Sequence, residues 1–382
     1  MADTRITDAW LSDPAAQTVM GLLIEAGHQA YFVGGCVRNA LLGAPVADVD
    51  IATSALPDTV SVLAENAGFK AIPTGIDHGT ITIVVEDQPF EVTTFRRDIE
   101  TDGRRAVVAF AKTFEEDAAR RDFTMNALYA NTDGEVIDPV GGLSDLRRRR
   151  LRFIGDPNDR IREDALRILR FFRFHAWYGD SDAGIDVEGL AACAAHVDML
   201  DQLSKERIGH EMRKLLSALD PAPSLASFAA TGGLMRVLPG ADGTGLAALV
   251  HIENEVSLPP DWLRRLAMIG GEDAESNLRL SRVDSRRLSR LTSTDGGPGE
   301  LGFRLGRETA ISALAIQSAQ QGRVLTDADL NEASAGAEAR FPIKAADLAQ
   351  RFSGPELGQA LAMAERRWID SQFTLSREDL LG

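Results

Sequence analysis

Cysteine is scarce in this chain of 382 residues. Only Cys36 and Cys193 occur, far apart in the sequence and outside any Cys-x-x-Cys motif or Cys/His cluster. Zinc sites are built from closely spaced Cys and His residues, and disulfide scaffolds are rich in cysteine. The two thiols therefore argue against a zinc site and fit a reduced, cytosolic compartment.

Long hydrophobic runs are also lacking. No stretch of about 18 consecutive apolar residues occurs, which is the length that a membrane-spanning helix needs. The first residues, Met1 to Arg5, do not show the basic-then-apolar order of a signal peptide. We therefore expect a cytoplasmic protein without a membrane span, and its length predicts two or more domains.

The chain as a whole has no excess of positive charge. The formal net charge is −16, which by itself argues against a nucleic-acid partner. However, the segment from Arg147 to Arg173 holds ten arginines against four acids. A local basic stripe on an acidic protein can hold a phosphate backbone, and a solvated basic helix would give the same pattern, so composition leaves both interpretations open.

The first part of the chain predicts mixed helices and strands. Helices are expected at 15–27, 37–42 and 57–67, and strands at 30–33, 49–52, 80–86, 89–95, 127–130 and 136–137. The last two strands are joined by Asn131-Thr132-Asp133-Gly134, a typical hairpin turn. Residues 1–145 are therefore expected to form a compact α/β domain with a mixed sheet.

The pattern changes after Leu151. Pro157 is expected to begin a long helix, and periodic segments rich in Ala and Leu continue to Gly382. The remainder is therefore predicted to be all-helical. We divide it into residues 146–216 and 217–382.

The segment with the most chemical information begins at Gly34. Gly34 and Gly35 free the backbone for a turn and Arg38 follows, which together suggest a phosphate ligand. Asp48 and Asp50 are separated by one residue, so on a strand they point to the same face. Two adjacent carboxylates repel unless a cation lies between them, which predicts a two-metal phosphoryl-transfer centre. A plain turn with two solvent-facing acids is the alternative.

Three downstream acids extend this interpretation. Glu91 lies between apolar residues in a predicted strand, where it either completes the metal site or is an exposed edge acid. Arg121 and Asp122 can neutralise a phosphate and accept a hydrogen bond from a ribose hydroxyl, unless they form a local salt bridge. On the expected helix, Asp164 and Arg167 (i, i+3) and Glu163 and Arg167 (i, i+4) are neighbours.

Asp164 and Arg167 have two interpretations. Together they offer an acceptor and a donor that can meet the hydrogen-bonding edge of cytosine or adenine. The alternative is a surface salt-bridge ladder that includes Glu163 and continues at three-residue steps through Arg170 and Arg173.

These motifs, in this order, resemble the class II tRNA nucleotidyltransferase family. That family includes CCA-adding enzymes and bacterial poly(A) polymerases, within the wider DNA polymerase β-like superfamily. The similarity runs from about Tyr31 to about Leu216, where a Ser-Lys-Glu-Arg-Ile segment resembles the family's next motif. It rests on the segments GGCVRN, DVD, FEVTTF, RRDFTMNAL, DPVGGLSDL and REDALRILRFFRF.

The resemblance implies a nucleotidyltransferase head over 1–145, a helical neck with a nucleotide-selecting motif over 146–216, and a tRNA-binding body and tail over 217–382. It implies Mg²⁺ bound by Asp48 and Asp50, with Glu91 as a further catalytic residue. Nucleotide binding is implied for Gly34, Gly35, Arg38, Arg121, Asp122, Asn126, Glu163, Asp164, Arg167, Arg170 and Arg173. Among these, Glu163, Asp164 and Arg167 would be the amino-acid template that selects CTP and then ATP.

Two positions depart from the family pattern. Asn39 stands where Asp is usual, which keeps hydrogen bonding but removes a charge. Ala47 stands where a Lys often precedes the acid pair, so a supporting phosphate or salt-bridge contact is lost while the metal site is kept.

The expected reaction is addition of C, C and A to the 3′ end of tRNA from CTP and ATP, with release of pyrophosphate. A basic loop, expected within 96–116, is associated in the family with addition of the terminal A, so its presence favours full CCA addition. A disordered connector is the alternative. A poly(A) polymerase or A-adding enzyme is the alternative within the family. A non-catalytic RNA-binding protein with a vestigial head is the alternative from another class.

Overall fold

The computed structural model describes residues 4–76, 79–102, 105–293 and 295–382. They form two compact units, Met1–Glu211 with Ser227–Val237, and Met212–Ala226 with Leu238–Gly382. The first unit holds the strands, which are β1 (Ala30–Val33), β2 (Asp50–Thr53), β3 (Lys70–Gly75), β4 (Thr80–Val85), β5 (Gln88–Thr94), β6 (Arg96–Asp102), β7 (Arg105–Phe110), β8 (Tyr129–Ala130) and β9 (Val136–Ile137).

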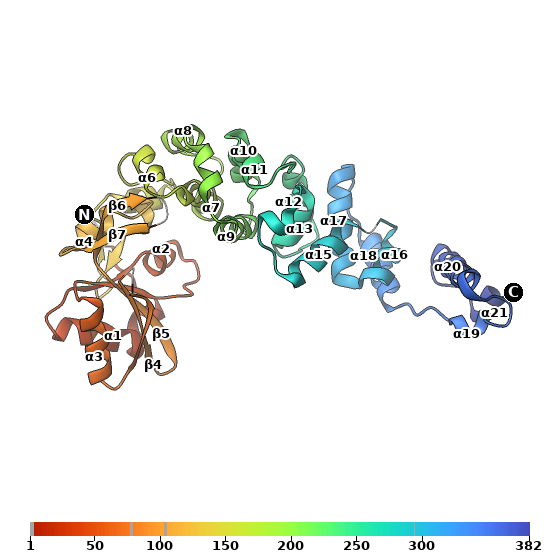
Figure 1. Ribbon diagram of the computed structural model, residues 1–382, viewed down its shortest axis with the longest axis horizontal. Helices are drawn as coiled ribbons and strands as arrows, with labels where there is room; N and C mark the ends of the chain where they lie inside the picture. Colours follow the sequence, from red (N-terminus) through yellow and green to blue (C-terminus); the bar gives the residue numbers. More distant parts are fainter. Residues whose placement is uncertain (1–3, 77–78, 103–104, 294) are drawn as a thin grey trace. The chain divides into compact units, whose positions relative to one another are not determined.

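The helices follow the same chain order (Figure 1). Up to residue 216 they are η1 (Ala9–Ser12), α1 (Pro14–Glu25), α2 (Gly35–Leu42), α3 (Pro57–Asn66), α4 (Phe114–Ala119), η3 (Thr124–Asn126), α5 (Gly142–Arg147), α6 (Pro157–Glu163), α7 (Leu166–Tyr178), α8 (Val187–Ala195), η4 (Val197–Gln202) and α9 (Lys205–Leu216). Beyond it they are α10 (Ala222–Ala230), α11 (Gly233–Val237), α12 (Leu246–Glu255), α13 (Trp262–Ile269), α14 (Ala274–Asn277), α15 (Arg282–Thr292), α16 (Pro298–Leu305), α17 (Arg307–Gln321), α18 (Asp327–Glu338), α19 (Ala345–Leu348), α20 (Gly354–Asp370) and α21 (Arg377–Leu381).

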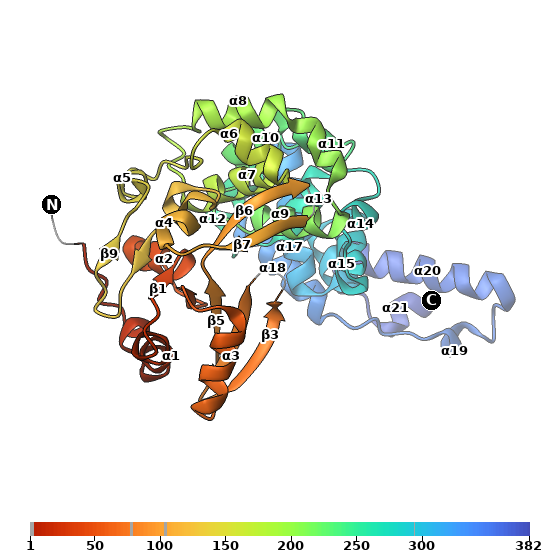
Figure 2. The ribbon, with the colours of Figure 1, turned by 60° about the vertical axis from the view of Figure 1, so that its left-hand side comes forward.

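A seven-stranded mixed sheet organises the head, in the order β3-β4-β5-β2-β1-β8-β9. Strand β2 pairs in parallel with β5 and antiparallel with β1. Helices α1 and α3 pack beside the strands (Figure 2) and bury apolar side chains such as Val19, Leu23 and Val60. The predicted α/β head followed by a helical remainder is confirmed.

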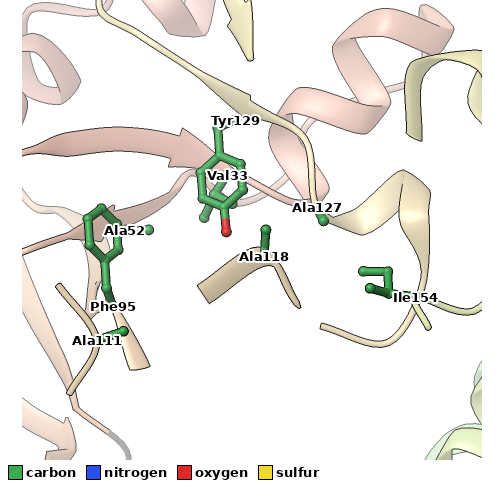
Figure 3. Packing of buried hydrophobic residues seen from close by; sticks show 8 residues of the cluster. All are labelled: Val33, Ala52, Phe95, Ala111, Ala118, Ala127, Tyr129 and Ile154. Atoms are coloured by element: carbon green, nitrogen blue, oxygen red, sulfur yellow. The ribbon is translucent and has the colours of Figure 1, made fainter. Parts of the chain in front are cut away.

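A second apolar cluster lies on the side of the sheet that carries Ala52 (Figure 3). Its members come from β1, β2, β8, α4 and the connecting segments before α4, after η3 and before α6. They are Val33, Ala52, Phe95, Ala111, Ala118, Ala127, Tyr129 and Ile154. Tyr129 is fully buried, and its hydroxyl points toward the helix that carries Ala118. This cluster packs α4 against β1, β2 and β8.

The structure differs from the sequence expectations at two places that bear on the site. The predicted basic loop within 96–116 begins as an antiparallel hairpin, β6–β7, whose tip residues Gly103 and Arg104 lie outside the described residues. The prediction of one long helix from Pro157 is wrong. The helix ends before Asp164, which has extended backbone angles (φ −151°, ψ 107°). Its side chain accepts a hydrogen bond from the Leu166 N–H and so begins α7.

The second unit is helical throughout its described part. Its centre contains an ionic cluster in which Glu253 of α12 accepts hydrogen bonds from Arg264 and Arg265 of α13. The last three helices enclose a separate apolar core around Trp368. Over the described residues, no helix is both long enough and apolar enough to cross a membrane.

Candidate active site

The turn between β1 and α2 places the predicted phosphate-binding residues. Gly34 has φ +74° and ψ −115°, a conformation that side-chain-bearing residues rarely adopt. Its N–H donates to the Leu128 carbonyl, and a Cβ at this position would lie 3.4 Å from Nη1 of Arg121. Helix α2 begins at the next residue, Gly35, so its first N–H groups have no partner within the helix and suit an anion.

The carboxylates lie at the start of β2. Asp50 is the first residue of the strand and is half-buried, whereas Asp48 precedes the strand and is exposed, so the two do not share one strand as predicted. Glu91 of β5 stands opposite Asp50 in the parallel register and is exposed. Burial, followed by the charge of Glu91, raises the pKa of Asp50 to about 6, with Asp48 acting in the same direction and Arg121 opposing it.

This donor set fits a hard divalent cation. Carboxylate oxygens are the ligands that Mg²⁺ prefers, and it usually binds through one or two of them together with phosphates and water. The raised pKa of Asp50 means that its charge is unfavourable without a nearby cation. In the part of the chain that the structure describes, no group of three or more His, Cys, Asp or Glu side chains could hold a metal ion alone. Metal binding by Asp48 and Asp50, and any role of Glu91, stay predictions.

Arg121 is held beside the glycine turn by a residue that the sequence analysis missed. Its Nη2 donates to Oδ2 of Asp117 at 2.9 Å, while Nη1 faces Gly34. Tyr129 donates to the same Oδ2 at 2.8 Å. Burial would raise the pKa of Asp117, but Arg121 and Arg120 outweigh it and lower that pKa to about 2. The four-residue spacing between Asp117 and Arg121 is the one sequence signal that could have found it.

Asp122 forms a long-range ion pair instead of the local salt bridge considered as the alternative. Its Oδ2 accepts from Nε of Arg170 at 2.7 Å, across 48 positions in sequence. Its Oδ1 accepts from the Phe123 N–H and from Nδ2 of Asn126, whose Oδ1 in turn accepts from Nη1 of Arg38. Burial would raise the pKa of Asp122, and Arg170 and Asn126 lower it to about 2. A ribose contact by Asp122 stays a prediction, and it would use a carboxylate that these partners already occupy.

The break between α6 and α7 separates the predicted template residues. Glu163 pairs with Arg167 as expected for i, i+4 neighbours. The expected side-by-side placement of Asp164 and Arg167 on one continuous helix is wrong, since Asp164 lies in the break and pairs with Arg207 of α9 at 2.8 Å. Arg207 is a second residue that the sequence analysis left without a role, although it falls in the segment quoted from α9.

The arginine stripe of α7 is half-buried rather than solvated. Arg170 binds Asp122, and Nε of Arg173 lies 2.6 Å from Oε2 of Glu211. The guanidinium carbons of Arg170 and Arg173 lie 5.2 and 4.2 Å from the centroid of the Phe174 ring. Arg170 and Arg173 are therefore not part of a solvated ladder, although Glu163 does pair with both Arg160 and Arg167. Nucleotide contacts by Arg170 and Arg173 stay a prediction.

Comparison with known protein families places two matches on this chain. Residues 30–152 match the poly A polymerase head domain, which covers the sheet and the carboxylates. Residues 184–243 match a probable RNA- and SrmB-binding site of polymerase A.

Curated relatives carry one consistent name. A CCA-adding enzyme of Geobacillus stearothermophilus is 36% identical over 328 residues, covering 81% of this chain and 79% of that protein. One from Limosilactobacillus reuteri is 40% identical over 252 residues, covering 64% of this chain and 60% of that protein. The match thus spans about three fifths of the length of the latter relative.

Solved structures give the same result for the fold. The Bacillus stearothermophilus CCA-adding enzyme in complex with CTP has a TM-score of 0.73 at 28% identity and covers 96% of this chain and 94% of its own. The Thermotoga maritima CCA-adding enzyme complexed with tRNA has a TM-score of 0.70 at 18% identity, covering 100% of this chain and 98% of its own. At that lower identity the likeness concerns the fold alone.

Proposed function

This chain belongs to the family of class II CCA-adding enzymes and poly(A) polymerases, and from that premise we propose that it adds C, C and A to the 3′ end of tRNA. The substrates would be CTP and ATP, and pyrophosphate would be released. The name shared by the curated relatives supports this choice within the family. The relative solved in complex with CTP, at 28% identity, supports the nucleotide substrate class.

One observation carries the proposal. Asp50, whose pKa is raised to about 6, lies within electrostatic range of both Arg38 and Arg121. Arg121 in turn presents Nη1 to the Gly34 turn. Nucleotidyl transfer requires a carboxylate that can bind a metal ion next to a turn that can bind the phosphates of the nucleotide. Asp50 and the Gly34 turn supply these two parts.

Different residues of the chain would bind the triphosphate and the base. The N–H groups at the start of α2 and Nη1 of Arg121 would hold the triphosphate, and Glu163, Asp164 and Arg167 would select the base. The 3′-hydroxyl oxygen of tRNA would attack the α-phosphorus and lose its proton to water. The bond between that phosphorus and the oxygen bridging to the β-phosphate would break, and pyrophosphate would leave. The protein contributes positioning and charge stabilisation rather than a covalent intermediate.

Mg²⁺ is the proposed metal. Nucleotidyltransferases of this family are generally metal-dependent. Asp48 and Asp50 would hold the ion, and when bound it would stabilise negative charge that develops on the phosphate oxygens and lower the pKa of the attacking hydroxyl.

The decisive experiment uses purified full-length protein, Mg²⁺ and three tRNA transcripts that end before CCA, after the first C, or after the second C. Each nucleoside triphosphate is supplied alone and in combination. We expect CTP to extend the first two transcripts, ATP to extend the third, and extension to stop at the completed CCA end. Continued addition of A would contradict this proposal and favour a poly(A) polymerase. Binding of tRNA without any extension would favour a non-catalytic RNA-binding protein.

The template role of Arg167 gives a separate prediction. Arg167→Ala removes the donor that would read the base, so we expect the preference for CTP and ATP over UTP and GTP to fall about ten-fold or more. The measurement is kcat/KM for each of the four nucleotides. Arg162→Ala is the matched control, because Arg162 is exposed on the neighbouring α6 and pairs only with the exposed Asp159 among the described contacts. Lower activity with unchanged preference would reject the template role, since Arg167 also holds the Arg120 and Arg160 carbonyls.

A further inference from the structure

Arg38 is a buried cation whose hydrogen-bond partners are all neutral. Arg38 is only 7% exposed to solvent. Over the described residues its guanidinium donates to Oδ1 of Asn39, to Oδ1 of Asn126 and to the hydroxyl of Tyr178. A buried charge is costly unless its environment compensates it, so these neutral groups decide where the guanidinium is held.

Tyr178 makes two kinds of contact with Arg38. The hydroxyl accepts a hydrogen bond from Nη2 at 2.8 Å, and the guanidinium carbon lies 4.0 Å from the ring centroid. A hydrogen bond from a charged donor is stronger than one from a neutral donor. A cation–π contact becomes stronger when it is shielded from water. Tyr178 is the last residue of α7 and comes from a part of the chain 140 positions away.

Arg38 is joined to α7 a second time, by a different path. Its Nη1 donates to Asn126, Asn126 donates to Asp122, and Asp122 binds Arg170. Arg170 and Tyr178 are eight residues apart on α7, which corresponds to about 12 Å along the helix. The contacts therefore close into a ring that begins and ends at Arg38 and includes two turns of α7.

Two attachments this far apart restrain a helix more than one does. A single contact leaves α7 free to pivot about it, whereas contacts at Arg170 and Tyr178 oppose both rotation and sliding relative to α2. Helix α7 begins at Leu166, directly after the break that holds Asp164. The ring thus connects the Gly34 turn to the segment that carries Arg167.

We propose that Tyr178 is a positioning residue that couples the Gly34 turn, through Arg38, to the base-selecting start of α7. The proposal rests on the proposed function for naming the two ends as triphosphate-binding and base-selecting. The ring of contacts itself stands on the geometry above. In this arrangement the contacts fix the distance between the triphosphate at the Gly34 turn and the base near Arg167.

Two substitutions separate the contacts of Tyr178. Tyr178→Phe keeps the aromatic ring and removes the hydroxyl. We expect it to lower kcat/KM for CTP and for ATP about ten-fold. Tyr178→Leu removes both contacts, and we expect a loss of about a hundred-fold. In Tyr178→Phe the loss should fall on KM, with kcat within about two-fold of the wild type, and the preference for CTP over UTP should fall as well. A purely structural role would lower activity equally with all nucleotides and leave that preference unchanged.

A second-site change tests the coupling directly. Asn39→Asp places a carboxylate where Arg38 already makes contacts from Nε and Nη2. The new charge pair holds the guanidinium without Tyr178, so Tyr178→Phe should cost about three-fold or less in the Asn39→Asp background. Strictly additive losses in kcat/KM would overturn the proposal.

Trp177→Phe is the matched control, because the adjacent Trp177 is 46% exposed on the same helix. It should leave kcat/KM and the CTP preference unchanged. The melting temperatures of Tyr178→Phe and Trp177→Phe should stay within about 3 °C of the wild type, because Tyr178 is half-buried, Trp177 is exposed and each variant keeps an aromatic ring. Equal losses in Tyr178→Phe and Trp177→Phe would contradict the assigned role.

Equilibrium binding of CTP without tRNA keeps this inference separate from the proposed function. If the wild type binds CTP but extends no tRNA, the proposed function fails, and about ten-fold weaker CTP binding by Tyr178→Phe would still support the coupling. If the wild type extends tRNA and Tyr178→Phe binds and uses CTP normally, only the inference about Tyr178 fails.

Discussion

Asp50→Asn should reduce nucleotide incorporation by about a thousand-fold or more, because it removes a negatively charged ligand from the proposed metal site. The measurement is single-turnover extension of tRNA at saturating CTP and Mg²⁺. Asp58→Asn is the control, since Asp58 is an exposed acid on α3 and should leave the rate unchanged. Extension by Asp50→Asn within about ten-fold of the wild type would remove Asp50 from the reaction.

The same substitution should stabilise the metal-free protein, which distinguishes lost chemistry from lost folding. The pKa of Asp50 is raised to about 6, against about 3.9 for an unfolded chain. The native state therefore binds the proton more tightly, and the ionised carboxylate lowers the free energy of unfolding at neutral pH. As the pH falls through 6 toward 4, this penalty disappears.

Thermal unfolding in the presence of a chelator tests the sign. We expect Asp50→Asn to melt above the wild type at pH 7.5, with a difference that shrinks as the pH is lowered toward 4. Added Mg²⁺ should raise the melting temperature of the wild type more than that of the variant, because a ligand stabilises the state that binds it. A variant that melts below the wild type at pH 7.5 would show that Asp50 is needed for folding instead.

Glu253→Gln should cost the second unit about 3–5 kcal/mol of stability, because it leaves two buried guanidiniums without a carboxylate. Arg264 and Arg265 are 3% and 1% exposed, and Glu253 is 1% exposed. Arg265 also donates to the carbonyls of Leu216 and Leu219, so its cation cannot turn out to solvent without breaking them. The expected fall in the melting temperature of this unit is on the order of 10 °C.

Differential scanning calorimetry of the full chain gives this measurement, with Glu255→Gln as the control. Glu255 is exposed and lies two residues further along α12, so its substitution should change the melting temperature by less than about 2 °C. Similar melting curves for the two variants would show that the buried Glu253 cluster does not stabilise the fold.

Several elements could be predicted because their signals are local. Strand β1 was expected at 30–33, the residues it occupies, since a short apolar run ends there at a glycine pair. Gly43 closes α2 in the left-handed conformation, and Pro57 stands at the first position of α3, as such residues do at helix ends. These preferences act within a few residues, so they can be found in a sequence.

Other elements were missed because nothing local marks them. Strand β3 lies at the edge of the sheet and has no buried residue, so it lacks the apolar alternation that indicates a strand. The break at Asp164 contains neither glycine nor proline and depends on the cap of Leu166 and the ion pair with Arg207. Sequence periodicity cannot detect such a break.

The site residues divide in the same way. By itself the sequence determined which chemistry-bearing residues are present, the turn at Gly34, and the adjacency of two acids at Asp48 and Asp50. Only the tertiary structure decided which distant charges meet: Asp122 with Arg170, and Arg173 with Glu211. The physical reason is that turns and helix ends are set by backbone preferences of neighbouring residues, whereas a buried ion pair depends on which distant segments pack together and exclude water.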